Sequence, residues 1–414
     1  MDMKITPSRL SGTLEAVSSK SYAHRLLICA ALADRPTRVY VNRLSDDIRA
    51  TARCLTAMGC VVENEPSALL VTPPRKLSDS VTLQCGESGS TARFLLPLAA
   101  HLFGRFTLTG EGTLLGRPFA PLCRALETAG CAFSGDTLPL TGVGRLRPGN
   151  FSIAGDISSQ FISGLLFALP LLDGESRVIL TTPLQSAAYV EMTIEVLRLF
   201  GVAVEKRGYG FYIQGNQRYV SPGEATAEGD WSNAAFFLCM GALGGPIALR
   251  GLSLDSAQGD REIVNLLRRF GAGVEGCTVT AGALRGIPID ASQIPDLVPT
   301  LAVVAAAAEG ETRIHNAQRL RLKESDRIQS TFALLNSLGA DVTILEDGLL
   351  IRGGAELRGG TVDGAGDHRI VMATAAASCV CVNPVVIRGC AAVNKSYPSF
   401  FEDFKALGGL ADVV

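Results

Sequence analysis

The strongest constraint on the fold is an internal repeat with a period of about 70 residues. Six times, an amphipathic helical pattern ends in a glycine and continues into a short apolar run, as in CLTAMGCVVE and LLNSLGADVT. The glycines lie 68 to 71 residues apart, at Gly59, Gly130, Gly201, Gly271, Gly339 and Gly408. Glycine is favoured directly after a helix because other side chains strain in the left-handed conformation found there. The near-constant register predicts six copies of one structural unit.

A second helical pattern begins about 40 residues before each glycine, as in SSKSYAHRLL and GESGSTARFLL. Its start is small and polar, which suits a helix N-cap, and its apolar continuation indicates a helix buried on most faces. A strand-like segment such as TRVYV or RFTLTG lies between the two helices. Each unit is therefore predicted to be helix, strand, helix and further short strands, which is an α/β architecture.

The repeat also predicts the domain organisation. A chain of 414 residues fits two domains of about 200 residues each. The sixth unit is cut short soon after Gly408, and the segment MKITPSRLSGTL is a candidate to supply its missing strands. We expect residues 19–227 to form an inserted domain of units one to three. Residues 1–18 and 228–414 would form a second domain of units four to six, which holds both termini.

Composition narrows the class of protein. The chain has 47% apolar and 19% charged residues and a formal net charge of −2, which exclude a disordered chain and a globally basic nucleic-acid binder. Eleven cysteines without a CxxC pair are typical of reduced, mostly buried thiols in a cytosolic protein. No apolar signal core opens the chain, and no uninterrupted apolar stretch is long enough to span a membrane. The starting expectation is a soluble cytoplasmic enzyme, and the bland alternative is a repeat scaffold without catalytic residues.

Ionisable residues gather at the starts of the predicted helices and in the adjoining loops. The basic ones are Lys20, Arg25, Arg93, Arg117, His368, Arg369, Lys395 and those of RLRLKESDR (319–327). Helix N-termini already attract anions, and guanidinium groups bind phosphate and carboxylate in a bidentate manner. These positions predict one focused pocket for an anionic ligand. Acidic residues at the same places, Asp296, Glu324 and Asp367, are either salt-bridge partners or a general acid and base.

Other motifs are missing. The four histidines show no metal-site spacing, and the chain lacks both GxxxxGK[ST] and GxSxG. We therefore assign no metal and no cofactor. Gly86 and Gly89 in GESGS are weak evidence for a phosphate-binding loop, because two glycines alone are common.

Six segments carry a family resemblance: SKSYAHR (19–25), SSQF (158–161), IPD (294–296), LKESDR (322–327), DHR (367–369) and NKSYPSFFED (394–403). Together, and in this order, they resemble the 5-enolpyruvylshikimate-3-phosphate synthases of the enolpyruvyl transferase family over almost the whole chain. The resemblance implies transfer of the enolpyruvyl group of phosphoenolpyruvate to the 5-hydroxyl of shikimate 3-phosphate, with release of phosphate, by addition and elimination. It also implies an inside-out, barrel-like α/β fold whose ligand cleft lies between two domains, with shikimate 3-phosphate on the 19–227 side. A cytoplasmic monomer of the shikimate pathway, without nucleic-acid or membrane partners, is expected.

The resemblance also implies roles for single residues. Phosphoenolpyruvate contacts would be Lys20, Gly89, Arg117, Gln160, Arg327, Arg369 and Lys395. Shikimate 3-phosphate contacts would be Lys20, Ser21, Arg25, Ser158, Ser159, Gln160, Tyr189, Asp296 and Lys323. Asp296 would take the proton from the attacking hydroxyl, and Glu324 would protonate the methylene carbon of phosphoenolpyruvate. Lys20, His368 and Lys395 would assist proton transfer and stabilise charge.

The chain departs from the family pattern in three places. Val17 and Ser18 stand where the family usually has Pro-Gly, and Glu87 opens a Glu-Ser-Gly-Ser stretch where Asn-Ala-Gly-Thr is common. Arg319 stands where an asparagine is often found. These departures leave the roles of Glu87 and Arg319 open.

Two other functions stay in view. The related transferase that acts on UDP-N-acetylglucosamine typically has a cysteine five residues before an Arg-Pro pair. Here the pair is Arg117-Pro118 and that position is Gly112, while Cys123 lies on a predicted helix where we interpret it as a packing residue. The second alternative is a catalytically inactive binding protein. It is disfavoured because Lys20, Asp296, Glu324 and Lys395 are all present.

Overall fold

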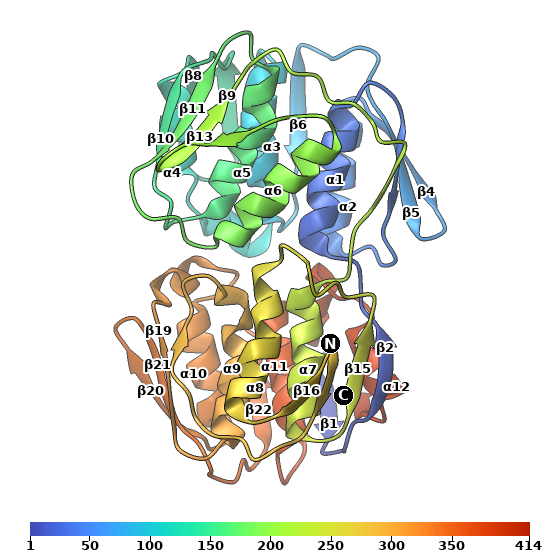
Figure 1. Ribbon diagram of the computed structural model, residues 1–414, viewed down its shortest axis with the longest axis vertical. Coiled ribbons are helices and arrows are strands. Elements are labelled where there is room, and N and C mark those ends of the chain that lie inside the picture. Colours follow the sequence, from blue (N-terminus) through green and yellow to red (C-terminus); the bar gives the residue numbers. More distant parts are fainter. The chain divides into compact units, whose positions relative to one another are not determined.

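The computed structural model describes all residues from Met1 to Val414, which divide into two compact units. The terminal unit comprises Met1–Val17 and Glu228–Val414, and the inserted unit comprises Ser18–Ala227. Each unit holds three four-stranded sheets and six α-helices (Figure 1). The predicted α/β class and its six similar repeat units are confirmed.

The inserted unit follows the predicted order in each repeat. Its helices are α1 (Lys20–Leu32), α2 (Asp46–Ala57), α3 (Gly89–Leu102), α4 (Ala120–Glu127), α5 (Ser159–Ala168) and α6 (Ala187–Leu199), with the 3-10 helices η1 (Gly112–Gly116) and η2 (Leu169–Leu171). Its sheets, in spatial order, are β14 (Glu224–Thr226), β3 (Thr37–Tyr40), β5 (Ala68–Thr72) and β4 (Val61–Glu65); β6 (Ser80–Gln84), β7 (Arg105–Thr109), β9 (Leu140–Gly144) and β8 (Cys131–Phe133); and β10 (Asn150–Ile153), β11 (Ser176–Leu180), β13 (Gly210–Ile213) and β12 (Glu205–Lys206).

The terminal unit repeats this plan. Its helices are α7 (Trp231–Leu243), α8 (Ile263–Phe270), α9 (Val298–Ala307), α10 (Arg327–Ser337), α11 (His368–Ser378) and α12 (Phe400–Ala406), with η3 (Gly259–Glu262), η4 (Pro295–Leu297), η5 (Gln318–Leu322) and η6 (Cys390–Lys395). Its sheets are β16 (Gly273–Glu275), β17 (Thr278–Thr280), β15 (Ile247–Arg250) and β2 (Gly12–Glu15); β18 (Ile289–Asp290), β19 (Glu311–His315), β21 (Gly348–Arg352) and β20 (Asp341–Leu345); and β22 (Gly360–Asp363), β23 (Val385–Arg388), β1 (Met3–Thr6) and β24 (Leu410–Val413).

Every sheet has the same pairing pattern, one parallel pair continued by two antiparallel pairs. In four repeats the first helix connects the parallel pair, as α3 does between β6 and β7. In the first and fourth repeats the parallel pairs are instead β14 with β3 and β2 with β15, which α1 and α7 do not connect. The N-terminal segment supplies two strands, because β1 pairs with β23 and β24, and β2 pairs with β15. The prediction that this segment completes the last repeat is confirmed, and β2 additionally completes the sheet of the fourth.

The glycines of the repeat have the conformation that the sequence predicts. Gly59, Gly130, Gly201, Gly271, Gly339 and Gly408 all have φ between 76° and 105°. Five of the six buried helices also begin at a side-chain cap, from Ser19, Ser88, Ser158, Asp230 and Asp367. The prediction of a polar cap is wrong for α9, which follows η4 without one. Proline in the first turn of α9 already removes a backbone donor, so less capping is needed there.

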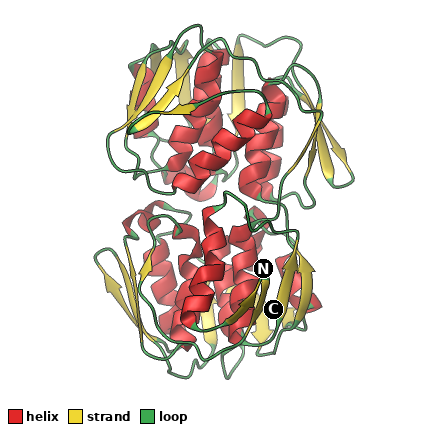
Figure 2. Cartoon of the chain, in the orientation of Figure 1, coloured by secondary structure: helices red, strands yellow, loops and turns green.

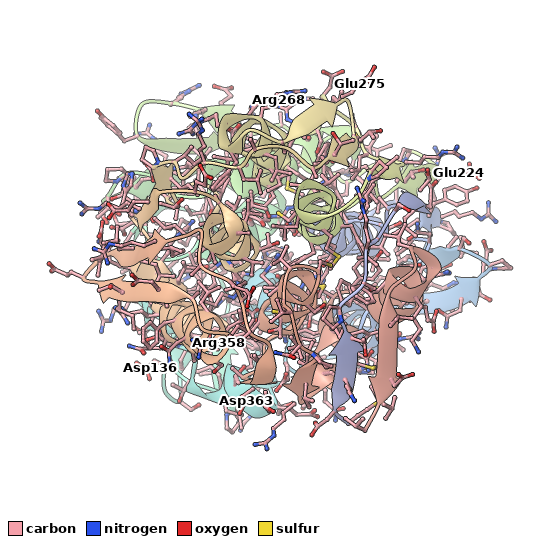
Figure 3. The ribbon with its side chains drawn as sticks, turned by 90° about the horizontal axis from the view of Figure 1, so that it is seen from below. Asp136, Glu224, Arg268, Glu275, Arg358 and Asp363 are labelled. Carbon is pink, nitrogen blue, oxygen red and sulfur yellow. The ribbon has the colours of Figure 1, made fainter.

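The core of each unit is made of the first helices of its repeats, with strands outside them (Figure 2). Every residue of α11 is buried, including the His368 and Arg369 that begin it. Exposed charged side chains such as Arg268, Glu275 and Arg358 lie at the periphery (Figure 3). The cysteines are free and mostly buried, as predicted. None of the helices has both the length and the hydropathy that a membrane-spanning helix needs.

Candidate active site

In the inserted unit, Lys20 is the first residue of α1 and is paired with an acid from the next helix. Its Nζ lies 2.8 Å from Oδ2 of Asp47, in the first turn of α2. Asp47 is not among the predicted site residues, although an acidic residue in a first helical turn after a serine cap is a visible signal. The pair holds the ammonium group of Lys20 at the start of α1.

Arg25 lies one turn further along α1 and is only 2% exposed. It donates from Nε to Oγ1 of Thr193, and from its two Nη atoms to the backbone carbonyls of Ser21 and Tyr189, the last two bonds both 2.7 Å long. Its guanidinium carbon also lies 5.0 Å from the centroid of the Phe94 ring. Burial lowers the pKa of Arg25 to about 10, so the side chain stays cationic at neutral pH. Three residues with predicted roles, Ser21, Arg25 and Tyr189, are thus in direct contact.

The starts of α3 and α5 meet at a second cluster. Oε1 of Gln160 accepts a 2.7 Å hydrogen bond from Arg93, and Nε2 of Gln160 donates to Oγ of Ser90. A methyl group added at Gly89 would lie 3.1 Å from Nη1 of Arg117 and 3.7 Å from Oε1 of Gln160. The predicted residues Gly89, Arg117 and Gln160 therefore lie together, with Arg93 beside them. The sequence identifies Arg93 as a cation at a helix start but does not predict its contact with Gln160.

The two serines that precede Gln160 differ in what they do. Oγ of Ser158 accepts a hydrogen bond from the backbone N–H of Gln160 and so caps α5. Ser159 is the first residue of α5 and is 7% exposed. One of the two hydroxyls thus has a structural role in the helix, besides any role in binding.

The terminal unit centres on Arg327, which is 1% exposed and contacts three carboxylates. Its Nη1 donates to Asp296 at 2.7 Å, its Nη2 to Glu324 at 2.6 Å, and its Nε to Asp367 at 2.8 Å. Asp367 comes from the cap of α11, Asp296 from η4 and Glu324 from the loop before α10. Burial alone would lower the pKa of Arg327, but Asp367, Glu324 and Asp296 raise it above its usual value. One permanently charged guanidinium thus joins the fifth and sixth repeats.

Asp296 is the acid with the most cationic neighbours. Besides Arg327, its carboxylate lies 3.2 Å from Nη2 of Arg369 and 3.5 Å from Nζ of Lys323. Burial opposes ionisation of Asp296, but Arg369, Lys323 and Arg327 outweigh it and hold its pKa well below the usual range. Asp296 is therefore an anion at neutral pH, which is the form that can accept a proton.

Lys323 follows η5, and its pKa is shifted toward the neutral form, whereas that of Asp296 is shifted toward the charged form. Burial lowers the pKa of Lys323 to about 8, although Asp296 favours the charged form. Lys323 is thus mostly cationic at pH 7 and titrates just above it. The other predicted residues of this unit are also buried: His368, whose Nδ1 lies 3.6 Å from Oδ1 of Asp367, and Lys395, the last residue of η6.

Comparison with known proteins identifies the family. The family model described as EPSP synthase (3-phosphoshikimate 1-carboxyvinyltransferase) matches residues 5–404. The 3-phosphoshikimate 1-carboxyvinyltransferases of Clostridium novyi and Clostridium kluyveri are 42% and 44% identical, each over 99% of this chain and 98% of the relative. The chain belongs to the EPSP synthase family. Its activity is that of a 3-phosphoshikimate 1-carboxyvinyltransferase, a transferase of aromatic amino acid biosynthesis, and the family implies phosphoenolpyruvate and shikimate 3-phosphate as substrates.

Solved structures agree with this assignment. An EPSP synthase from Acinetobacter baumannii superposes with a TM-score of 0.83 at 25% identity, and the match covers 100% of both chains. The enolpyruvyl transferase NikO from Streptomyces tendae has a TM-score of 0.80 at 19% identity over 99% of this chain and 98% of its own, a likeness of fold alone. The fold of EPSP synthases therefore extends over the whole chain.

The structure accounts for one departure from the family pattern. Glu87 accepts a 3.3 Å hydrogen bond from the backbone N–H of Thr113, and its carboxylate fills the space beside Gly112. Gly112 has φ of 52°, and a side chain there would collide with Glu87. Glu87 thus ties the loop that leads to Arg117, and a side chain at position 112 would displace the Glu87 carboxylate. Cys123 is buried in α4, as the packing interpretation predicts.

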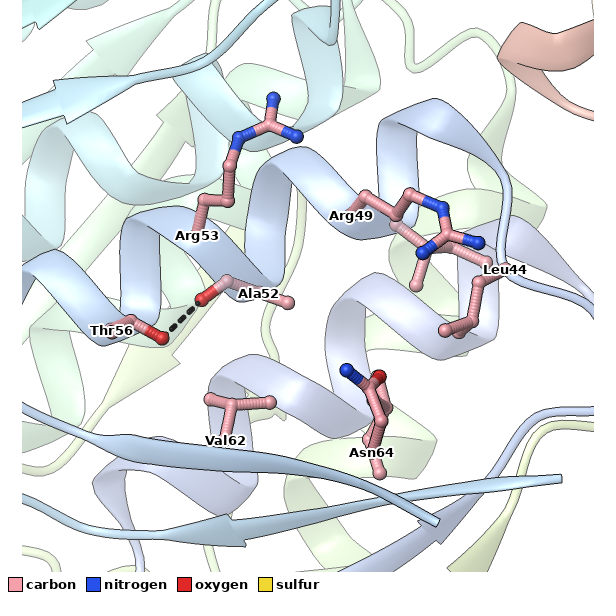
Figure 4. Close-up of a pocket in the computed structure, with 9 residues that line it drawn as sticks. Leu44, Arg49, Ala52, Arg53, Thr56, Val62 and Asn64 are labelled. Atoms are coloured by element: carbon pink, nitrogen blue, oxygen red, sulfur yellow. Dashed lines mark hydrogen bonds between the residues drawn. The ribbon is translucent and has the colours of Figure 1, made fainter. Parts of the chain in front are cut away.

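A second departure from the family pattern is Arg319, whose charge contributes to the lowered pKa of Lys323. Arg319, in η5, donates to the backbone carbonyl of Ser292 at 2.8 Å. A pocket of about 420 Å³ on the inserted unit lies between α2 and strands β4 and β5, and Arg53 points away from Val62 and Asn64 there (Figure 4). It contains none of the predicted site residues. No group of three or more His, Cys, Asp or Glu side chains is arranged to hold a metal ion.

Proposed function

We propose that Asp296 is the general base and Glu324 the general acid of the transferase reaction. Asp296 takes the proton of the 5-hydroxyl of shikimate 3-phosphate while its oxygen bonds to C2 of phosphoenolpyruvate. Glu324 delivers a proton to the methylene carbon, which becomes a methyl group. Loss of a proton from that methyl group and departure of phosphate then restore the double bond. The observation that supports this assignment most strongly is the Asp296 carboxylate, held ionised by Arg369, Lys323 and Arg327.

We propose that the inserted unit supplies most contacts to shikimate 3-phosphate. The contacts are Lys20, Ser21, Arg25, Ser158, Ser159, Gln160 and Tyr189, with Asp296 and Lys323 from the terminal unit. The buried Arg25 supports this, because the oxygens that accept its hydrogen bonds belong to hydroxyl and carbonyl groups. Such an arginine retains a net positive charge for an anionic ligand.

Phosphoenolpyruvate would be bound by cations of both units. The residues are Lys20, Gly89, Arg117, Gln160, Arg327, Arg369 and Lys395. Neutralising and orienting two anions is a large share of the work in joining them. Arg327 donates to three carboxylates, so we expect it chiefly to orient them. Its guanidinium would contact the anion only after one of these carboxylates moves away. Lys20, His368 and Lys395 would stabilise the charge that develops on phosphate as it leaves.

The decisive experiment is release of inorganic phosphate on mixing the purified protein with both substrates. Phosphate should appear only when phosphoenolpyruvate and shikimate 3-phosphate are both present. Substitution of UDP-N-acetylglucosamine for shikimate 3-phosphate is the matched control and should give none. Binding of both substrates without release of phosphate would instead identify an inactive member of the family.

The enzyme is further proposed to work as a cytoplasmic monomer. Free, mostly buried thiols are consistent with a reducing compartment. Light scattering coupled to size exclusion should give a mass near 43.5 kDa. A mass twice this value, independent of concentration, would contradict the monomer.

A further inference from the structure

The terminal unit contains a buried carboxylic acid that has no part in the scheme above. Asp260 lies in η3, in the sequence SAQGD that follows β15, and it is only 2% exposed. Its Oδ2 accepts a hydrogen bond from the hydroxyl of Ser232, the second residue of α7. Its Oδ1 is buried and accepts no hydrogen bond. A buried carboxylate with one unsatisfied oxygen is costly as an anion, and that oxygen is a ready position for a proton.

Hydrogen bonds fix this carboxyl group against the start of α7. Gln258, two residues earlier, accepts from the backbone N–H of Trp231 at 3.1 Å and donates to the carbonyl of Gly229 at 2.8 Å. Asn233, next to Ser232, donates to the carbonyl of Ser396, which follows Lys395. Asp260 is therefore held at the same end of its unit as a proposed phosphoenolpyruvate ligand.

The charges that face Asp260 come from the other helix starts of the unit. Burial raises the pKa of Asp260 to about 6; Asp296 also raises it, Arg369 lowers it, and Asp230 at the cap of α7 raises it slightly. Glu228 faces the same segment through its hydrogen bond from Gln258. On its own element, Arg261 donates to the carbonyl of Leu254. Of these groups, Arg369 is the one cation that stabilises the Asp260 carboxylate.

We propose that Asp260 is the proton-linked group of the phosphoenolpyruvate site, binding a proton at Oδ1 when the anion arrives and releasing it when the anion leaves. The inference rests on the proposed function in one respect, the binding of the anion by Arg369. An anion on Arg369 offsets the charge that stabilises the Asp260 carboxylate and adds a second negative charge nearby. Both changes favour the neutral carboxyl group, and a proton moves from solvent to Oδ1.

The proposal predicts a specific pH dependence. The anion should bind best when Asp260 is already protonated, and binding should weaken as pH rises above 6, until Asp260 is ionised in the complex as well. A change in the charges that act on a carboxyl group shifts its pKa by about 1–3 units, so KM for phosphoenolpyruvate should rise at least about tenfold between pH 6 and 8 through this group. Phosphoenolpyruvate titrates in the same range, so the informative quantity is the ratio of wild-type to variant KM.

The test is KM for phosphoenolpyruvate from pH 5.5 to 8.5 in wild type, Asp260→Asn and Asp255→Asn. The asparagine at 260 mimics the neutral acid, so the ratio of wild-type to Asp260→Asn KM should rise about tenfold across this range. Asp255, an exposed acid of the same loop, is the control, and its variant should match wild type throughout. A ratio that is constant with pH would show a purely structural role for Asp260 and overturn the proposal.

A second variant covers the case in which Asp260→Asn does not fold. The Ser232 hydroxyl lowers the pKa of Asp260, so Ser232→Ala should move the rise in KM to higher pH. An unmoved or downward-shifted rise contradicts the proposal. Absence of phosphate release from the wild-type enzyme would instead remove the proposed function itself, which distinguishes the two failures.

Discussion

The two units share one architecture but surround their buried arginines with different oxygens. In the inserted unit, Arg25 donates to a hydroxyl and two carbonyls, and Arg93 donates to the Gln160 amide. In the terminal unit, Arg327 donates to three carboxylates and Arg369 lies 3.2 Å from a carboxylate oxygen of Asp296. Neutral acceptors position a guanidinium without cancelling its charge, whereas carboxylates cancel it and are themselves kept ionised.

The comparison suggests how one repeat provides two functions. Buried helix starts give both units the same framework of caps and backbone N–H groups. On the proposed assignments, the side chains added to that framework would make the inserted unit chiefly a binder of anions and would place proton transfer in the terminal unit. Substitutions of the proposed anion contacts, including Lys323 of the terminal unit, should therefore change KM, and substitutions of Asp296 and Glu324 should change kcat.

The largest effect is expected for Asp296→Asn. The amide cannot accept the hydroxyl proton, so kcat should fall by about 10²–10⁴-fold, the usual contribution of a general base. Arg327 keeps Glu324 and Asp367 as partners, so thermal unfolding should change far less than turnover. The matched variant in the other unit is Asp47→Asn, which removes one partner of Lys20 and should act mainly on KM. Wild-type kcat in Asp296→Asn would remove its role as the base.

Glu324→Gln should be almost as damaging, with kcat lowered by about 10²-fold or more because the methylene carbon loses its proton donor. The reaction run in heavy water separates this step from the others. Wild type should incorporate deuterium into the methylene group of unreacted phosphoenolpyruvate, because the methyl intermediate can lose either isotope. The variant should incorporate it more slowly than wild type by the same factor as kcat. Undiminished incorporation would assign the proton to another residue.

How much of this could be predicted from the sequence depends on the range of the interactions. Gly201 and Ser158 act within one turn, so periodicity and capping rules predict their conformations. The other five repeats have a polar cap, so their pattern predicts one on α9 as well. The prediction is wrong there because Pro299 in the first turn already removes one backbone donor. Asp47 and Asp260 were missed because their partners, Lys20 and Ser232, lie 27 and 28 residues away along the chain. Only tertiary packing defines such pairs.

The pH dependence of KM for shikimate 3-phosphate tests whether Lys323 of the terminal unit contributes a charge to binding. Burial lowers the pKa of Lys323 to about 8, so its charge is present below pH 8 and is lost as pH rises through that value. KM for shikimate 3-phosphate should then rise by roughly tenfold above pH 8, which corresponds to one charged hydrogen bond. Lys323→Arg keeps its charge and should flatten the profile. An unchanged profile in the arginine variant would mean that another group titrates.

Gly89→Ala tests the proposal that the inserted unit contributes chiefly to anion binding. The new methyl group would lie 3.1 Å from Nη1 of Arg117, so the guanidinium must shift by a few tenths of an ångström. KM for phosphoenolpyruvate should rise several-fold while kcat stays within about twofold, because orientation of the anion changes more than proton transfer. Gly135→Ala, where a methyl group meets no atom within 4 Å, is the control and should leave both constants unchanged. A fall in kcat with constant KM would contradict the division between the units.

The smallest effects are expected at the neighbouring serines Ser158 and Ser159, where loss of stability and loss of binding can be measured separately. Ser158 caps α5, so Ser158→Ala should cost about 1 kcal/mol of unfolding free energy. Ser159→Ala removes a hydroxyl that does not cap the helix, so it should leave stability within about 0.5 kcal/mol. Its cost should be one substrate hydrogen bond, a rise of roughly two- to tenfold in KM for shikimate 3-phosphate. Chemical denaturation and KM measured on both variants would reveal whether Ser159 serves the ligand alone while Ser158 serves both the fold and the ligand. If Ser159→Ala lowered stability as much as Ser158→Ala without changing KM, both hydroxyls would belong to the fold.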